Sequence, residues 1–368
     1  MIILENTYFF TGFPGFIATS LIKQIIHNGY SFKHMYLLVL PGQLEKAQTE
    51  INKISFEENV STDLFIIITG DITKPQLGIE QQINEQIRKE ITHVFHLAAI
   101  YDLAVPEKIA MDVNVNGTKN VNDWILALPA LQRFVYFSTS YVAGKREGHI
   151  LESELEMEQS FKNHYERTKY DAEVLVKEIM NAVPTTIIRP GIVVGHSTSG
   201  ETIKFDGPYF ILNFLDKLRF FPIIPYLGAG KAEGNFVPVD YIFNATIYLS
   251  HVDAGIGKTY QLTDPRPYTM KEVYRLLMKE YLGREPRGTI PLFLAKSLLS
   301  LAVCRRWLRV EKEALDYFTC MAHYDCSQAQ KDLQGSGISC PDFTEVIPAM
   351  VHFYKRHKND SDKHLKIK

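Results

Sequence analysis

Two side chains suited to acid–base chemistry, the Tyr165 phenol and the Lys169 ammonium, lie four residues apart in the run NHYERTKYD. On a helix, residues i and i+4 share one face and lie about 6 Å apart along the axis. A lysine charge at that distance lowers a phenol pKa of about 10 by ~1–3 units, towards the range of a general acid or base. The spacing alone does not identify an active site, because it occurs twice more. The other pairs are Tyr141/Lys145 and Tyr354/Lys358.

The helices and strands predicted around each Tyr/Lys pair are therefore needed to identify which pair could be functional. Over the first 190 residues, apolar runs alternate with amphipathic runs. Apolar strands separated by helices are typical of a parallel sheet covered on both faces, and right-handed crossovers favour a doubly wound α/β fold. Strands are predicted over residues 7–11, 34–40, 64–69, 93–98, 133–139 and 185–189, and helices over 17–27, 43–54, 81–90, 117–128 and 161–180.

The first predicted strand runs into the turn TGFPGFIA, residues 11–18. A small-residue turn before a helix suits a pyrophosphate, because the helix N-terminus offers free N–H groups and a positive dipole end. Gly12 would permit the tight turn, Gly15 the close approach of phosphate, and Ala18 close packing of the helix on the sheet. The spacing departs from G-x-G-x-x-G, so a plain strand–helix turn is the alternative interpretation.

The order of several short motifs resembles that of the extended branch of the short-chain dehydrogenase/reductase superfamily. The turn TGFPGFIA is similar to its nucleotide-binding loop, and Gly70-Asp71-Ile72 to its adenine-contacting motif. The resemblance runs from residue 7 to about residue 265 and is strongest to the fatty acyl-CoA reductase and thioester-reductase branch. The other matching motifs are residues 96–99 (HLAA), 114–118 (NVNGT), 138–140 (STS), 189–191 (RPG) and 235–240 (NFVPVD).

This resemblance selects Tyr165/Lys169, since only Tyr165 lies on the helix after the strand that ends in Ser-Thr-Ser. It implies that Tyr165 is the general acid, that Lys169 lowers its pKa and holds the nicotinamide ribose, and that Thr139 donates to the same substrate oxygen. Asn114 matches the family's asparagine that supports a proton relay. The nucleotide-contacting residues implied are Gly12, Pro14, Gly15, Phe16, Ile17, Leu40, Asp71, Ile72, Leu97, Ala98, Ala99, Tyr165, Lys169, Pro190 and Ile192.

Residue 40 bears on the choice of cofactor. NAD enzymes usually carry Asp or Glu at the end of the second strand, whereas NADP enzymes carry Arg near it. This chain has Val39-Leu40-Pro41 there, and Leu40 stands where the reductases that it resembles usually have arginine. The expectation of NADP(H) over NAD(H) therefore rests on the family resemblance.

The amino-acid composition indicates which binding partners and which cellular compartment to expect. A net charge of −2 and a pI near 6.6 give no electrostatic reason to expect nucleic acid. The cysteines at 304, 320, 326 and 340 show neither zinc spacing nor a disulfide frame, and no metal site is predicted. The N-terminus lacks the basic start and apolar run of a signal peptide, so a cytoplasmic protein is expected.

After residue 195 the alternation loosens, as expected of a substrate-binding part. Aromatic residues between 209 and 226 favour either a lipophilic acyl pocket or the core of a small domain. The predicted substrate contacts are Ser140, Tyr209, Phe210 and Phe214. The run TIPLFLAKSLLSLAV, residues 289–303, is too short to span a membrane. A core or lid helix is expected there, with an amphipathic segment on a membrane surface as the alternative.

These expectations combine into an NAD(P)H-dependent reductase of a lipophilic aldehyde, ketone or acyl thioester, the last as acyl-CoA or a carrier-bound chain. Residues 1–195 are predicted to form a Rossmann domain to which residues 235–265 return, and residues 196–368 mainly a substrate-binding and C-terminal helical part. Two alternatives remain open. One is a sterol- or nucleotide-sugar-type dehydrogenase or epimerase of the same fold, and the other is an idle NAD(P)-binding sensor.

Overall fold

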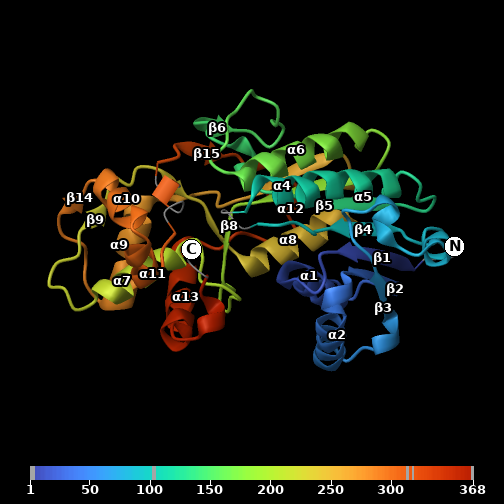
Figure 1. The fold of residues 1–368 in the computed structure, drawn as a ribbon, viewed down its shortest axis with the longest axis horizontal. Helices are drawn as coiled ribbons and strands as arrows, with labels where there is room; N and C mark the ends of the chain where they lie inside the picture. Colours follow the sequence, from blue (N-terminus) through green and yellow to red (C-terminus); the bar gives the residue numbers. More distant parts are fainter. Residues whose placement is uncertain (1–4, 102–104, 312–314, 317–318, 366–368) are drawn as a thin grey trace.

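A computed structural model describes residues 5–101, 105–311, 315–316 and 319–365, and within them seven parallel strands form one sheet (Figure 1). These strands are β1 (Asn6–Thr11), β2 (Phe32–Val39), β3 (Phe65–Thr69), β4 (His93–His96), β5 (Arg133–Phe137), β7 (Thr185–Pro190) and β12 (Lys258–Leu262). They lie in the order β12-β7-β5-β4-β1-β2-β3, with every neighbouring pair parallel. This order confirms the predicted doubly wound α/β fold of Rossmann type.

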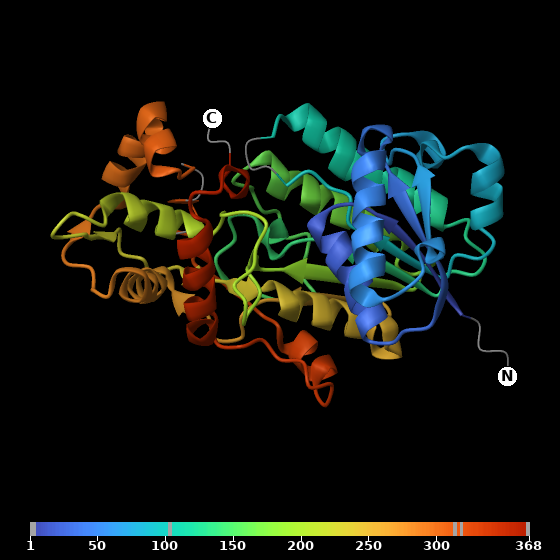
Figure 2. The same ribbon diagram turned by 90° about the horizontal axis from the view of Figure 1, so that it is seen from below.

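Helices cover both faces of the sheet (Figures 1 and 2). One face packs against α1 (Phe16–His27), α2 (Leu44–Glu58), α8 (Val239–His251) and α12 (Ser327–Leu333). The other packs against α3 (Gln81–Ile87), α5 (Gly117–Ile125) and α6 (His164–Ile179). Because interior strands are buried on both sides, consecutive residues such as Tyr8, Phe9 and Phe10 are all inaccessible to water.

The helix before β5 begins earlier than the sequence pattern predicts. It was expected over residues 117–128, but α4 (Glu107–Ala110), the π-helical turn η4 (Met111–Asn116) and α5 form one helical run. Gly117 brings this run close to the loop after β3, since a Cβ there would lie 2.7 Å from Ile72 Cδ1. The π turn contains Asn114, and such turns are frequent at functional sites.

A second core lies beside the sheet, at the left of Figure 1. It is built mainly from α7 (Tyr209–Leu218), α9 (Met270–Leu282) and α13 (Phe343–His357). The chain returns from it to the sheet in α8, β12 and α12, while a domain boundary at residue 195 stays a prediction. Short paired strands complete the fold: β6 (Gly148–Ile150) with β15 (Ala322–Tyr324), β8 (Ile192–Val194) with β11 (Phe236–Pro238), β9 (Tyr226–Leu227) with β14 (Thr289–Ile290), and β10 (Glu233–Gly234) with β13 (Tyr268–Thr269).

The apolar run at residues 289–303 does not form the single helix that was expected. After β14 it forms α10 (Leu292–Ser300), and α11 (Ala302–Leu308) follows a break at Leu301. Arg305 stabilises this break, because its Nη1 donates to the Leu299 and Ser300 carbonyl oxygens that end α10, each at 2.9 Å. Phe293 and Val303 are 66% and 78% exposed, so much of the run lies outside the core. Within the described residues, no helix is long and apolar enough to cross a membrane.

Candidate active site

Tyr165 lies in the first turn of α6, close to the point where β5 ends. Asn163 starts the helix there, because its side-chain oxygen accepts a hydrogen bond from the Glu166 N–H at 2.9 Å. Thr139 follows β5, and its side chain lies close enough to Tyr165 to lower the pKa of the phenol. Its Oγ1 also accepts from the Tyr141 N–H at 3.3 Å, so its own proton is available to Tyr165 or to a substrate oxygen. The structure thus brings together Thr139 and Tyr165, the two predicted hydrogen-bond donors to that oxygen.

The serines on either side of Thr139 have other partners. Ser138 Oγ donates to the Glu173 carboxylate. Ser140 Oγ donates to the Arg189 carbonyl oxygen at 3.0 Å. Because a hydroxyl has one proton, this bond leaves Ser140 able to accept from a substrate but not to donate to it, and the substrate contact stays a prediction.

The Tyr165 phenol is held in its neutral form. Burial raises its pKa to about 12, the nearby Thr139 side chain partly opposes this, and the Glu166 charge adds to the rise. Lys169 is not among the groups that shift this pKa, so its predicted lowering of the Tyr165 pKa stays a prediction. A neutral phenol at physiological pH is a proton donor, as the general acid in the reduction of a carbonyl must be.

Lys169 hydrogen-bonds residues of β5 and not Tyr165, the partner that the sequence predicted. Its Nζ donates to the Tyr136 hydroxyl at 3.0 Å and to the Phe137 carbonyl oxygen at 2.7 Å. Burial lowers the pKa of Lys169 to about 7, and the Glu173 carboxylate opposes that shift. The lysine is consequently charged below about pH 7 and loses its charge as the pH rises above it.

Asn114 fastens three segments together at the π turn. Its Oδ1 accepts from the Ile100 N–H at 2.8 Å, and its Nδ2 donates to the Ile100 carbonyl and the Thr168 hydroxyl, each at 3.0 Å. Both amide protons are used, so only an Oδ1 lone pair is left for a proton relay. The structure supports a role in holding the loop after β4 against α6, and the relay stays a prediction.

The glycine loop fits a dinucleotide by its shape. A Cβ at Gly12 would lie 2.8 Å from the Ala98 nitrogen, and one at Gly15 would lie 2.6 Å from the Gly12 carbonyl oxygen. Thr11 Oγ1 accepts from the Leu97 and Ala98 N–H groups, each at 3.1 Å, which joins the loop to the segment after β4. In the described part of the chain, no side chain caps the first turn of α1, whose N–H groups are thus available to a pyrophosphate.

The other predicted nucleotide contacts lie along the same edge of the sheet, where the parallel strands end. Leu40 follows β2 and is 50% exposed, so its side chain is accessible to a nucleotide. Asp71 follows β3, and its Oδ1 accepts from the Thr73 N–H and hydroxyl, each at 2.8 Å. The remaining positions are Pro14, Phe16 and Ile17 at the start of α1, Ile72 after β3, Ala99 after β4, Pro190 at the end of β7 and Ile192 at the start of β8.

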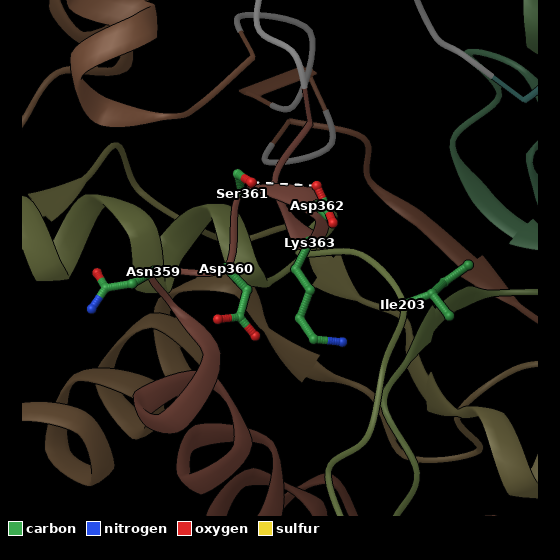
Figure 3. A pocket seen from close by; sticks show the side chains of 6 residues that line it. All are labelled: Ile203, Asn359, Asp360, Ser361, Asp362 and Lys363. Carbon is green, nitrogen blue, oxygen red and sulfur yellow. Dashed lines mark hydrogen bonds between the residues drawn. The ribbon is translucent and has the colours of Figure 1, made fainter.

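The predicted substrate aromatics divide between a core and a pocket. Tyr209 is wrong as a pocket residue, because it is buried in the second core and its hydroxyl accepts from the Gly195 N–H at 3.2 Å. Phe210 and Phe214, on the same helix, line an apolar pocket between α7, α10 and α11. A separate polar hollow at residues 359–363, shown in Figure 3, contains none of the predicted site residues.

Sequence reasoning missed the ion pair beneath the site. Glu173 and Arg189 are 0% and 1% exposed, and Arg189 Nε donates to Glu173 Oε1 at 2.9 Å. Glu173 lies four residues after Lys169, as Lys169 lies four after Tyr165, so all three share one face of α6. That repeated spacing was the available signal.

Fold and site together define an extended short-chain dehydrogenase/reductase. The chain belongs to the Male sterility protein family of NAD-binding domains, whose model matches residues 10–246. That membership makes it an NAD(P)-dependent oxidoreductase of the extended short-chain type.

Individual relatives agree with this placement. The chain is 26% identical over 294 residues to the non-canonical nonribosomal peptide synthetase cpsA of Aspergillus campestris, covering 75% of this chain and 28% of that protein. It is 27% identical over 283 residues to fatty acyl-CoA reductase 1 of Gallus gallus, covering 64% and 53%. The chain thus spans about half or less of these relatives. The crystal structure of the terminal R domain from the myxalamid PKS-NRPS biosynthetic pathway has the same fold, with a TM-score of 0.80 at 24% identity, covering 97% of this chain and 92% of that one.

Proposed function

We propose that this chain reduces a lipophilic acyl thioester, supplied as acyl-CoA or on a carrier, with hydride from NADPH. The observation that carries the proposal is the pair of neighbouring neutral hydroxyls, Thr139 and Tyr165, at the edge of the sheet that holds the glycine loop. Two relatives, a fatty acyl-CoA reductase and a nonribosomal peptide synthetase, bear names that fit acyl substrates.

Each side chain has a physical task in this reaction. A bound nicotinamide supplies the hydride. Negative charge then develops on the carbonyl oxygen, where Tyr165 donates a proton and Thr139 a second hydrogen bond. Lys169 would hold the ribose hydroxyls of the nucleotide. A thiol leaving group of pKa near 8.5 needs little further acid assistance, so the same residues serve thioesters and aldehydes.

The pocket beside α7 is the proposed site of the acyl chain. It is lined by Phe210 and Phe214 of α7, by Leu298 and Leu299 of α10, and by Leu308 of α11. Side chains of this kind bury a hydrocarbon tail favourably, at about 0.8 kcal/mol per CH₂. The exposed apolar side chains of α10 and α11 adjoin it, and they are where the proposed contact with a membrane surface would lie.

Acyl-CoAs of increasing length and the matching aldehydes, given with NADPH, test the proposal. We expect NADPH oxidation and free-thiol release to run in step, with kcat/KM rising with chain length. Oxidation with aldehydes alone would reject the thioester proposal and leave an aldehyde or ketone reductase. A sterol- or sugar-type dehydrogenase would respond to neither series, and an idle sensor would bind the nucleotide without turning over any carbonyl.

A pocket-filling variant sharpens this test. Ala295 lines the pocket from α10, and Ala295→Trp should abolish the gain from long chains while short acyl-CoAs react as before. Ser297→Trp adds the same bulk on the exposed side of the helix and should leave the length profile unchanged. If kcat/KM depended on acyl length in the same way in both variants, the acyl chain would have to bind outside this pocket.

The protein is proposed to prefer NADPH to NADH. The proposal rests on the resemblance to the reductase branch and on Leu40, which carries no charge to repel a 2′-phosphate. We expect Leu40→Asp to reverse it, because a carboxylate repels the 2′-phosphate and accepts from a free 2′-hydroxyl. Fluorescence titration with both nucleotides measures the change. Leu126 is also 50% exposed but lies at the end of α5, so Leu126→Asp controls for added charge. A wild type that clearly prefers NADH would contradict the proposal.

A further inference from the structure

The Lys169 ammonium belongs to a buried polar cluster that the roles above leave unused. Its Nζ donates to the Tyr136 hydroxyl at 3.0 Å and lies 4.4 Å from the centre of the Tyr136 ring. The Thr118 side chain also lies close enough to the Tyr136 hydroxyl to lower the pKa of this phenol. Thr118 Oγ1 lies 3.1 Å from His96 Nε2, and His96 Nδ1 lies 2.8 Å from Thr11 Oγ1. The cluster therefore joins Lys169 to the last residue of β1, directly before the glycine loop.

Counting protons fixes the direction of these hydrogen bonds, starting at β1. Thr11 Oγ1 accepts from the Leu97 and Ala98 N–H groups, so its own proton is donated to His96 Nδ1. His96 then carries its proton on Nε2 and donates it to Thr118. Burial lowers the pKa of His96 to about 3, which keeps this imidazole neutral.

The count continues to the lysine. Thr118 donates its proton to the Asn114 carbonyl oxygen at 2.6 Å, so towards His96 it acts as an acceptor. The Tyr136 oxygen presents a lone pair to Lys169 Nζ. Burial raises the pKa of Tyr136 well above its usual value, so the phenol stays neutral and cannot take over the lysine's charge.

We propose that Tyr136 is a positioning residue for Lys169: its hydroxyl oxygen and ring face hold the ammonium charged and in place to receive the nucleotide. The inference rests on the proposed function, because it assigns Lys169 to the ribose. A buried ammonium without an acceptor gives up its proton rather than stay charged. The second acceptor, the Phe137 carbonyl oxygen, comes from the next residue of β5, so one strand supplies both.

Other ionisable groups near Lys169 do not replace this contact. Glu173, on the same helix, favours the charged lysine, but its carboxylate is already paired with Arg189 from β7. His96, from β4, is neutral, and the Lys169 charge helps to keep it so. Tyr165, one turn earlier on α6, is also neutral. The Tyr136 hydroxyl is thus the side-chain acceptor that Lys169 contacts directly.

Tyr136→Phe keeps the ring and removes the acceptor oxygen. Because that oxygen favours the charged lysine, its loss lowers the pKa of Lys169, and the charge disappears at a lower pH than in wild type. We expect the alkaline fall in NADPH affinity, and that in kcat/KM, to move down by about one pH unit. At about pH 5, where Lys169 is charged in both proteins, the variant and wild type should be nearly equal. A fluorescence titration from about pH 5 to pH 10 measures the affinity.

Two comparisons decide whether the effect acts through Lys169. In a Lys169→Met background the alkaline fall should be absent, and adding Tyr136→Phe should change nothing further. Tyr8→Phe removes another buried hydroxyl from the sheet, one that contacts His251 at 2.8 Å, and should leave the pH profile unchanged.

The inference would be overturned if the alkaline fall in NADPH affinity were not shifted in Tyr136→Phe. It would also be overturned if Tyr136→Phe lost the same affinity with and without Lys169. The affinity profile needs no turnover, so it tests Tyr136 even if wild type reduces no carbonyl and the proposed function fails.

Discussion

Replacing Tyr165 by Phe should lower turnover by roughly 10²–10⁴ while NADPH affinity stays near that of wild type. The change removes the proton that Tyr165 gives to the substrate oxygen and keeps the ring. Thr139 remains as a hydrogen-bond donor, so the residual rate should exceed that of the uncatalysed reaction. Single-turnover measurement of NADPH oxidation, with affinity measured separately, distinguishes lost chemistry from lost binding.

Tyr170 offers a matched control on the same helix. Its ring packs against Phe161 with centroids 5.1 Å apart, and Tyr170→Phe preserves that contact. This variant should turn over at nearly the wild-type rate. If Tyr165→Phe were as active as Tyr170→Phe, the assignment of the general acid would be wrong.

The second large effect is expected in stability. Arg189→Met should lower the free energy of unfolding by ~3–5 kcal/mol, because it leaves the buried Glu173 carboxylate without its cation. Arg189 also donates to the Glu154 carbonyl oxygen at 2.9 Å, so the segment before α6 loses a contact too. Urea unfolding at pH 7 measures the change.

An exposed pair on the same helix provides the comparison. Arg167 Nε donates to Asp171 at 2.9 Å, but Arg167 is 59% exposed. Surface pairs one helical turn apart contribute about 0.3–0.5 kcal/mol, so Arg167→Met should barely move the transition. Similar losses in the two variants would show that burial does not govern the Glu173–Arg189 pair.

The parallel sheet was predictable because its strands are buried on both faces. Each reads as a short apolar run between turn residues, and the order of the motifs then gave the topology. The start of the helix before β5 was not predictable in the same way. Asp112, Asn114 and Asn116 interrupt its apolar pattern, and the π turn there shifts the period that a helical search assumes.

The candidate active site was likewise predictable only in part. Motif order located Thr139 and Tyr165, but it could not show where the Lys169 side chain points. Tyr136 reads as one more aromatic residue in the strand RFVYF, and its hydroxyl meets Lys169 only because β5 and α6 pack together. Similarly, hydrophobicity alone could not tell the exposed α10–α11 surface from a core helix, since both are rich in leucine.

The position of β12 limits how the chain can be shortened. This edge strand is made from residues 258–262, yet it pairs with β7, which ends at Pro190. Its outer side is partly protected, since the Gln261 N–H donates to Glu152 at 2.9 Å. A fragment cut at residue 246, where the family match ends, would lack β12 and leave β7 as an open edge able to pair with other chains. On the ribosome, likewise, the sheet cannot be completed until about 70 residues after β7 have been synthesised, so the nascent chain carries that open edge while the second core is still being made.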